Sequence, residues 1–524
     1  MYMTLGLHKS LQMQPDAVAI HSVGRTVTFR EYGDRVARLA GALRKLGVES
    51  GERVAMYSLN STRYLEYFMA VPWAGGVLNP VNIRWSQAEV LYSLDDSGTE
   101  VMIVDDTFKA TAAALAGAAK TVRHLIYAGD GETPEGMLNY ETLIEQAEPV
   151  EDAWRHDNDL AGIFYTGGTT GFPKGVMLSH ANLISAAMAV RIAGYFGGPE
   201  AVYLHAMPMF HLADFSIVIA LTISGGKHVV IPAFTPQATL EAIESERVTD
   251  ILLAPTMLQM TMEWLARNPG SAARLDLSSL KKLAYGASPI SQALVLRTQE
   301  VFPGVGLING YGMTELAPAA TYLAPQYHSE EGFASGRMRS VGKPYESVEV
   351  KVVDDSDREV PRGTVGEVIV RGQNVMLGYW NRPEETAKAL RDGWMHTGDG
   401  GYMDKDGFLY IVDRIKDMII TGGENVYSAE VENALASHPA VAQCAVIGIP
   451  DERWGETVHA VIVRKPGADV TPQELETHCR ALIAGYKVPR SVAFRESLPL
   501  TSVGKVNKNE LRKPYRDGNP HAGA

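Results

Sequence analysis

Cysteine is scarce in this chain, with only Cys444 and Cys479 among 524 residues. Two cysteines cannot form the disulfide framework of a small secreted protein, so we expect both to be buried apolar residues in a reducing, cytoplasmic setting. The N-terminus lacks a basic region followed by an apolar segment, which predicts no signal peptide. The longest mildly apolar run, residues 215–224, is too short to span a bilayer and predicts a buried helix.

Positive charge is also in deficit, because 48 Lys and Arg residues face 61 Asp and Glu residues, for a net charge of −13. This balance argues against nucleic acid as a partner, and it requires local donors to hold any anionic substrate. A hydrophobic content of 46% is ordinary for a globular protein, and the chain is too long for one core. We therefore expect two or more domains.

One loop sequence stands out, YTGGTTGFPKGVMLSH at residues 165–180. Its glycines let backbone N–H groups approach an anion, and its threonines and lysine add donors. It is not a Walker A loop, because Phe172 rather than lysine follows Gly171. A plain Gly/Thr surface loop is the alternative, but the ordered combination favours a phosphate-binding loop between a strand and a helix. The expected contacts are Thr166, Gly167, Gly168, Thr169, Thr170 and Lys174.

The segment TGGTTGFPKG resembles the signature of the adenylate-forming superfamily, which includes acyl-CoA synthetases, peptide-synthetase adenylation domains and luciferases. Further motifs of that superfamily follow in order, so the resemblance covers essentially the whole chain. It implies ATP and CoA as co-substrates, Mg²⁺ as cofactor and a small carboxylic acid as substrate. Relatives often form homodimers, and a homodimer is therefore possible here.

The order of strand-like and helix-like patterns predicts the fold class. Strands and helices alternate before the loop and again after it, which favours two largely parallel sheets covered by helices. Two alternating strands, residues 348–353 and 366–370, then predict a small β-rich subdomain. We expect an α/β protein with a large N-terminal domain at 1–413, a boundary at 414–417 and a small α+β C-terminal domain at 418–524. The resemblance implies that residues 414–417 are a hinge and that the C-terminal domain is mobile.

The sequence NGYGMTE, residues 309–315, follows a predicted strand, and ligands of open α/β sheets bind at the carboxyl ends of strands. A glutamate there can hold Mg²⁺ that also binds phosphate oxygens. An ordinary turn is the alternative for so short a sequence. The resemblance implies that Thr314 binds the α-phosphate, Glu315 the metal ion and Tyr311 the adenine. The predicted nucleotide site also includes Asn309, Gly310 and Gly312.

Two further segments complete the predicted nucleotide site. Asp399, in a Thr-Gly-Asp turn, can accept two hydrogen bonds from a ribose, and the resemblance pairs it with Arg414. The strand-exit sequence Gly286, Ala287 and Ser288 resembles the segment that lines the adenine and acyl sites. Small residues at Gly286, Ala287 and Gly310 predict room for an aromatic ring or an alkyl chain.

The segment at residues 207–214 resembles the one beside the acyl pocket, and it makes His211 a candidate gate or orienting group. Relatives that activate amino acids have an aspartate directly after the phenylalanine to hold the substrate amine. Here His211 stands in that place, which argues against an amino-acid substrate, although Asp214 follows three residues later.

The resemblance implies that residues of the C-terminal part act in successive steps of the reaction, first in adenylation and then in transfer to CoA. Lys505, in the sequence PLTSVGK, resembles the lysine that reaches the carboxylate and α-phosphate during adenylation, where its charge offsets negative charge in the transition state. Lys416 has the hinge position of the superfamily. The expected CoA contacts are Gly422, Gly423, Trp454, Tyr486 and Arg84.

These motifs predict an acyl-CoA synthetase that forms an acyl-AMP, releases pyrophosphate and transfers the acyl group to CoA. Three alternatives stay open: an adenylating enzyme that serves a carrier protein, a luciferase-like monooxygenase and a non-catalytic nucleotide-binding protein. Medium-to-long fatty acids and aryl acids are both compatible with the motifs. The segments around the pocket resemble bacterial fatty acyl-CoA ligases and favour a fatty acid.

Overall fold

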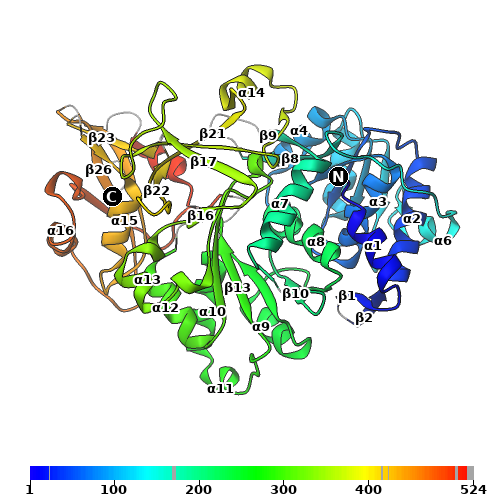
Figure 1. Cartoon of the computed structure of the whole chain (residues 1–524), viewed down its shortest axis with the longest axis horizontal. Coiled ribbons are helices and arrows are strands. Elements are labelled where there is room, and N and C mark those ends of the chain that lie inside the picture. The colour runs from blue at the N-terminus through cyan, green and yellow to red at the C-terminus, as the bar shows by residue number, and fades with distance from the viewer. Residues whose placement is uncertain are drawn as a thin grey trace.

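The computed structural model describes residues 1–22, 24–167, 173–196, 198–288, 290–414, 417–422, 424–451, 453–501 and 506–515. Strands in these ranges form four sheets, three in the N-terminal part and one in the C-terminal part (Figure 1). The predicted α/β class with a large N-terminal and a small C-terminal domain is thereby confirmed. The boundaries at 1–413, 414–417 and 418–524 stay a prediction, and Ile415 and Lys416 lie outside the described residues.

The first large sheet contains the strand that leads into the glycine-rich loop. Its order is β19 (Gly378–Tyr379), β9 (Lys174–Ser179), β8 (Leu160–Thr166), β4 (Val77–Pro80), β3 (Arg53–Tyr57), β5 (Val101–Val104), β6 (His124–Tyr127) and β7 (Leu138–Asn139). Pairing is parallel from β8 to β7 and antiparallel from β8 to β19. The sheet is therefore mixed at the edge where the loop lies.

The glycine-rich loop follows a strand, as predicted, but the prediction that a helix follows the loop is wrong. Residues 174–179 form β9, which pairs antiparallel with β8 and with β19. The loop thus connects two antiparallel strands, and the helix α7 (His180–Ile192) begins only after β9. The side chains of Val176 and Leu178 alternate into the core, which is the strand pattern that the glycines and proline before it obscured.

The second large sheet has nine strands. Its order is β16 (Lys343–Pro344), β15 (Thr321–Leu323), β14 (Gly306–Tyr311), β13 (Lys282–Gly286), β12 (Asp250–Leu253), β10 (Val202–His205), β11 (Lys227–Val230), β1 (Val18–Ser22) and β2 (Arg25–Thr28). The strands from β14 to β1 are parallel, so the carboxyl ends of β13 and β14 open on the same edge. That edge carries the predicted nucleotide motifs.

Helices cover both large sheets. In chain order they are α1 (Leu5–Met13), α2 (Phe29–Lys45), α3 (Thr62–Ala74), α4 (Gln87–Ser97), α5 (Lys109–Ala118), α6 (Tyr140–Gln146), α7, α8 (Leu212–Ser224), α9 (Pro236–Ser245), α10 (Pro255–Arg267), α11 (Pro269–Ala272) and α12 (Gln292–Val301). Helix α7 contacts β9, α8 contacts β11, and the two helices pack on each other between the sheets. Nearly every residue of α8 is buried, as expected for a helix that is apolar all round.

Two smaller sheets follow. The β-rich subdomain consists of β17 (Val348–Val353), β18 (Gly366–Gly372), β21 (Trp394–Met403), β20 (Leu390–Arg391) and β22 (Leu409–Arg414), with α14 (Pro383–Ala389) beside it. The C-terminal sheet consists of β24 (Glu424–Val426), β23 (Ile419–Thr421), β26 (Gly455–Arg464), β25 (Val441–Asp451) and β27 (Ser491–Phe494). Helices α15 (Ser428–Ala436), α16 (Pro472–Arg480) and α17 (Lys508–Arg512) complete this part. No helix in the described ranges combines the length and apolar character needed to cross a bilayer.

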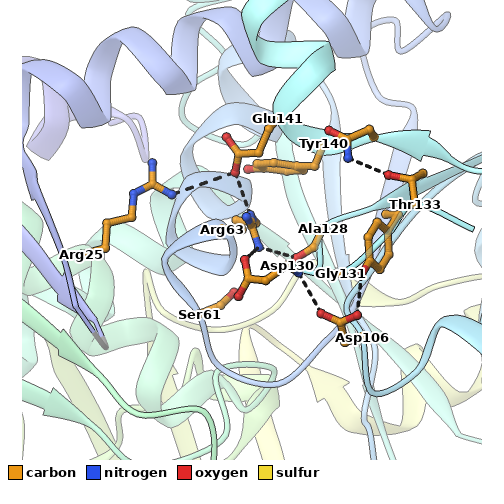
Figure 2. A network of polar contacts seen from close by, with 12 residues as sticks. Arg25, Ser61, Arg63, Asp106, Ala128, Asp130, Gly131, Thr133, Tyr140 and Glu141 are labelled. Atoms are coloured by element: carbon orange, nitrogen blue, oxygen red, sulfur yellow. Dashed lines mark hydrogen bonds and ion pairs between the residues drawn. The ribbon is translucent and has the colours of Figure 1, made fainter.

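A network of charged residues fastens the N-terminal helices together (Figure 2). Arg63 of α3 contacts Glu141 of α6 at 2.8 Å and Asp130 at 2.9 Å. Arg35 of α2 also contacts Glu141, and it forms a second ion pair with the fully buried Glu66. Figure 1 places α6 on the opposite side of the molecule from α15 and α16, so this network supports the fold at a distance from the C-terminal part.

Candidate active site

The ribose-binding candidates form a closed set of contacts at the edge between β14 and the β-rich subdomain. Arg414 Nε lies 2.6 Å from Asp399 Oδ1, across the register of β21 and β22. Tyr311 Oη donates a hydrogen bond of 2.6 Å to Asp399 Oδ2. Burial raises the pKa of Tyr311, and the charge of Asp399 adds to that effect, so the phenol stays a donor. Both oxygens of Asp399 thus have partners, and their remaining lone pairs can still accept from a ribose.

Glu315 lies in the short 3₁₀ turn η1 (Thr314–Leu316) that follows β14. Its side chain is buried, and its Oε1 accepts a hydrogen bond of 2.9 Å from Tyr379 Oη. The backbone N–H of Met376 donates to the Glu315 carbonyl oxygen. One buried carboxylate at a strand end suits Mg²⁺, which keeps water and phosphate oxygens in most of its positions. Among the described residues, no group of three or more His, Cys, Asp and Glu side chains is arranged to hold a metal.

Lys174 opens β9 and lies beside the same tyrosine. Its Nζ is 5.0 Å from the centre of the Tyr379 ring and 2.5 Å from Glu385 Oε2 of α14. The hydrogen bond from Lys174 lowers the pKa of Glu385 and so favours its charged form. Tyr379 therefore joins two predicted residues, Lys174 through its ring and Glu315 through its hydroxyl group.

The remaining nucleotide candidates lie at strand ends. Thr166 ends β8 and Gly167 follows it, and no atom of the described residues lies within 4 Å of where its Cβ would be. Ala287 has φ of +68°, a conformation that L residues rarely adopt and that occurs more often at functional sites. Thr314 opens η1, Ser288 follows Ala287, and Asn309 lies within β14. A Cβ on Gly312 would collide with the Pro318 carbonyl oxygen, so only glycine fits there.

The space predicted beside Gly286 and Gly310 is occupied. A Cβ on Gly286 would meet the carbonyl oxygen of Gly310, and a Cβ on Gly310 would collide with the hydroxyl oxygen of Tyr195. The absence of a side chain at Gly310 therefore makes room for the hydroxyl group of Tyr195 and leaves no empty space. The prediction of free room at these two residues needs this correction.

His211 is the N-cap residue of α8, where its Nδ1 accepts a hydrogen bond of 3.2 Å from the N–H of Ala213. Asp214 lies one turn into the helix with no exposed surface, and its Oδ2 is 2.8 Å from His205 Nδ1. His205 Nε2 continues to His228 at 2.9 Å. Asp214 is therefore engaged inside the core, and a role for His211 beside the acyl pocket stays a prediction.

In the C-terminal part, Gly422 and Trp454 lie together. Gly422 has φ of +62°, its N–H donates to the Trp454 carbonyl oxygen at 2.8 Å, and a Cβ there would press on the indole. The guanidinium groups of Arg453 and Arg490 lie 4.7 and 4.3 Å from the indole ring centre. Tyr486 is 38% exposed. In the N-terminal part Arg84 is exposed, and partial desolvation of its guanidinium group lowers its pKa.

Six predicted residues lie outside the described ranges, and their roles stay predictions: Gly168, Thr169, Thr170, Lys416, Gly423 and Lys505. Sequence reasoning missed Tyr379, Glu385, Arg490 and Tyr195. Tyr379 is about 200 residues from β9 in the chain, and only the pairing of β19 with β9 brings it there. Arg490 had a local signal, because it follows Tyr486 in a short basic segment.

Comparison with known proteins gives consistent matches. A family model described as AMP-binding enzyme matches residues 7–380, and one described as AMP-binding enzyme C-terminal domain matches residues 430–505. A feruloyl-CoA synthase of an Amycolatopsis species is 41% identical over 505 residues, which cover 96% of this chain and 97% of that protein. A medium/long-chain-fatty-acid–CoA ligase of Mycobacterium tuberculosis is 34% identical over 94% of this chain and 86% of that protein.

Among solved structures, the amide bond synthetase McbA from Marinactinospora thermotolerans superposes with a TM-score of 0.86 at 32% identity. The match covers 97% of this chain and 99% of that one. Both parts of the chain therefore have counterparts in the same solved protein.

Proposed function

From the premise that this chain belongs to the AMP-binding enzyme family, as an AMP-forming acid–CoA ligase, we propose that it activates an aryl acid or a medium-to-long fatty acid as an acyl-adenylate. The observation that carries the proposal is the set Tyr311, Asp399 and Arg414, held together at the carboxyl end of β14. This set presents a carboxylate to the ribose and an aromatic face to the adenine. The similarity to feruloyl-CoA and fatty-acid–CoA ligases supports the two acid classes.

The phosphates of ATP then extend towards Thr314, Lys174 and the glycine-rich loop. Glu315 would hold Mg²⁺, which neutralises charge on the phosphate oxygens when it is bound. Tyr379 fixes the Glu315 carboxylate with its hydroxyl group and lies next to Lys174 with its ring. Binding of ATP would draw Lys174 from Glu385 to a phosphate, since an ammonium group follows the larger negative charge.

In the first step, a carboxylate oxygen of the acid attacks the α-phosphorus of ATP, and the bond from that phosphorus to the bridging oxygen of pyrophosphate breaks. Lys505 would place its positive charge next to the attacking carboxylate and the α-phosphate, where negative charge concentrates in the transition state. The products are acyl-AMP and pyrophosphate.

In the second step, the CoA thiolate attacks the acyl carbonyl carbon, and AMP leaves with the electron pair of the broken C–O bond. We propose that the C-terminal domain rotates about Lys416 between the steps, so that Gly422 and Gly423 replace Lys505 at the site. Trp454, flanked by Arg453 and Arg490, offers an aromatic face and two positive charges to the nucleotide of CoA, with Tyr486 and Arg84 as further contacts.

Pyrophosphate release from ATP tests this function. The acids should include short, medium and long fatty acids, benzoates and cinnamates, each assayed with and without CoA. We expect release with one acid class, strongly increased by CoA. Release that does not respond to CoA would contradict CoA as the acceptor, and no release with any acid would contradict the ligase function.

A further inference from the structure

The two faces of β14 have different surroundings. Side chains alternate along a strand, so Asn309 and Tyr311 point to one face, and Ile308 and Gly310 point to the other. Tyr311 contacts Asp399 on the ribose side. Gly310 therefore faces away from the ribose contacts, together with Gly286, its register partner in β13.

Tyr195, three residues beyond the end of α7, occupies the face of Gly310. Its side chain is only 6% exposed, and its hydroxyl oxygen fills the place that a Cβ on Gly310 would take. The neighbouring residue Phe196 lies on the same face, because its carbonyl oxygen accepts from Lys282 Nζ at 3.2 Å, and Lys282 is in register with Gly306. Tyr195 and Phe196 thus pack across β13 and β14, the strands that carry Gly286 and Gly310.

A second tyrosine holds the first in place. Tyr345 is 3% exposed, and its hydroxyl group donates to Tyr195 Oη at 3.0 Å. The Tyr345 ring in turn stacks on Tyr322, with ring centres 4.9 Å apart and an angle of 28°. We call Tyr195 and Tyr345 the tyrosine pair.

The hydroxyl hydrogen of Tyr195 has no acceptor among the described residues. Tyr195 Oη accepts the bond from Tyr345, and within the described part of the chain this is the one hydrogen bond of its hydroxyl group. A buried O–H without an acceptor is costly, so such groups usually meet water or a ligand. The complementary ligand atom is an acceptor oxygen.

More polar atoms lie deeper on the same face. Tyr203 of β10 is in register with Asp250 of β12, which is in register with Lys282, so Tyr203 points to the side of Gly310. Among the described residues, Tyr203 Oη and Asp214 Oδ1 are buried without a hydrogen-bond partner. An interior with such groups is a poor environment for a long alkyl chain, which offers them no hydrogen bond.

We propose that the tyrosine pair closes the acid pocket, and that the acid is a compact aryl acid with an oxygen substituent that accepts from Tyr195 Oη. This inference rests on the proposed ligase function and selects between its two acid classes. The carboxylate of the acid must reach the α-phosphate at the strand ends, and Gly310 lies at that edge. A long fatty acid would have to displace two tyrosines that are each more than nine-tenths buried.

The test compares the catalytic efficiency kcat/KM of the wild-type protein and of Tyr195→Phe with three acids: para-methoxycinnamate, cinnamate and dodecanoate. The methoxy oxygen accepts but cannot donate, so it reports on the Tyr195 hydroxyl hydrogen alone. We expect the wild-type protein to prefer para-methoxycinnamate, and Tyr195→Phe to lower the efficiency with this acid about tenfold. The efficiency with cinnamate should change less than twofold.

Tyr322→Phe is the matched control, because Tyr322 lies outside the pair and its hydroxyl group donates to Glu346 at 3.2 Å. It should leave all three values unchanged. ATP affinity of each variant, measured by calorimetry, shows that the fold is intact, and Tyr345→Phe gives an independent second variant with a smaller loss for the methoxy acid.

Two results would overturn the proposal while the ligase function stands: preference of the wild-type protein for dodecanoate over both cinnamates, or an equal effect of Tyr195→Phe on methoxylated and unsubstituted acid. Failure of the ligase function itself looks different, because pyrophosphate would then be released with none of the acids.

Discussion

The two faces of β14 are built in different ways. On the face proposed for the ribose, Tyr311, Asp399 and Arg414 form an ion pair and a short hydrogen bond between residues of three strands. On the face proposed for the acid, Gly310 contributes no side chain, and Tyr195 fills the space from a distant part of the chain. An ion pair and a hydrogen bond thus hold the proposed nucleotide face together, whereas a tyrosine from another part of the chain fills the proposed acid face.

The largest expected effect is that of removing Lys505, which is proposed to contact both the carboxylate of the acid and the α-phosphate of ATP. Lys505→Ala should slow acyl-AMP formation by about 10²- to 10³-fold, since one charge aimed at the transition state is lost. Thioester formation from supplied acyl-AMP should be retained. Rapid-quench measurement of each step separates the two.

The exposed Lys465, in the same domain, provides the control variant Lys465→Ala. Equal loss in both steps for Lys505→Ala would argue against its assignment to adenylation alone.

The second effect concerns the ribose side. Asp399→Ala leaves Tyr311 without its acceptor and Arg414 without its counter-ion. The KM for ATP should rise about 10- to 100-fold, because a hydrogen bond to a charged group contributes about 1.5–3 kcal/mol. Steady-state kinetics with ATP varied at saturating acid measures this rise, and an unchanged KM for ATP would remove Asp399 from the nucleotide site.

A third, smaller effect concerns Glu315, the proposed ligand of Mg²⁺. Glu315→Gln retains an acceptor for Tyr379 Oη but removes the negative charge. Half-saturation by Mg²⁺ should therefore move to about tenfold higher concentration, with the fold preserved. A magnesium titration of pyrophosphate release reports this directly, and a curve that coincides with the wild type would exclude Glu315 as the ligand.

The smallest effect on catalysis is expected for His328, which is not among the proposed nucleotide or acid contacts. Burial lowers the pKa of His328 from 6.5 to about 4. The unfolded chain therefore binds a proton in this interval that the folded chain does not, so stability is complete above pH 6.5 and is lost as the pH falls towards 4. Between pH 7 and pH 5 this histidine should lower the free energy of unfolding by ~2 kcal/mol.

Urea unfolding at the two pH values measures this loss. His328→Gln, which can still contact Tyr285 Oη, should reduce it, and the exposed His156→Gln should leave it as in the wild type. Identical pH dependence in wild type and His328→Gln would show that other groups carry the acid sensitivity.

The difference between the two faces of β14 also explains which residues could be predicted from the sequence. Residues of the nucleotide face belong to short segments next to strand ends, so Thr314, Glu315 and Asp399 could be proposed from local patterns. Tyr379 and Tyr195 could not, because strand pairing and packing over more than 100 residues bring them to Lys174 and Gly310. The α/β class followed from the alternation of strands and helices. The hairpin of β8 and β9 did not, because glycine and proline mask the alternation where β9 begins.

The most direct test of the account is a crossed measurement on Asp399→Ala and Tyr195→Phe, in which the dissociation constant of ATP and the Michaelis constant of the methoxylated cinnamate are determined for both variants. The account predicts that Asp399→Ala weakens ATP binding at least ten times more than it raises the Michaelis constant of the acid, and that Tyr195→Phe does the reverse. If each variant changed both quantities by the same factor, the separation of nucleotide and acid across the two faces of β14 would be contradicted.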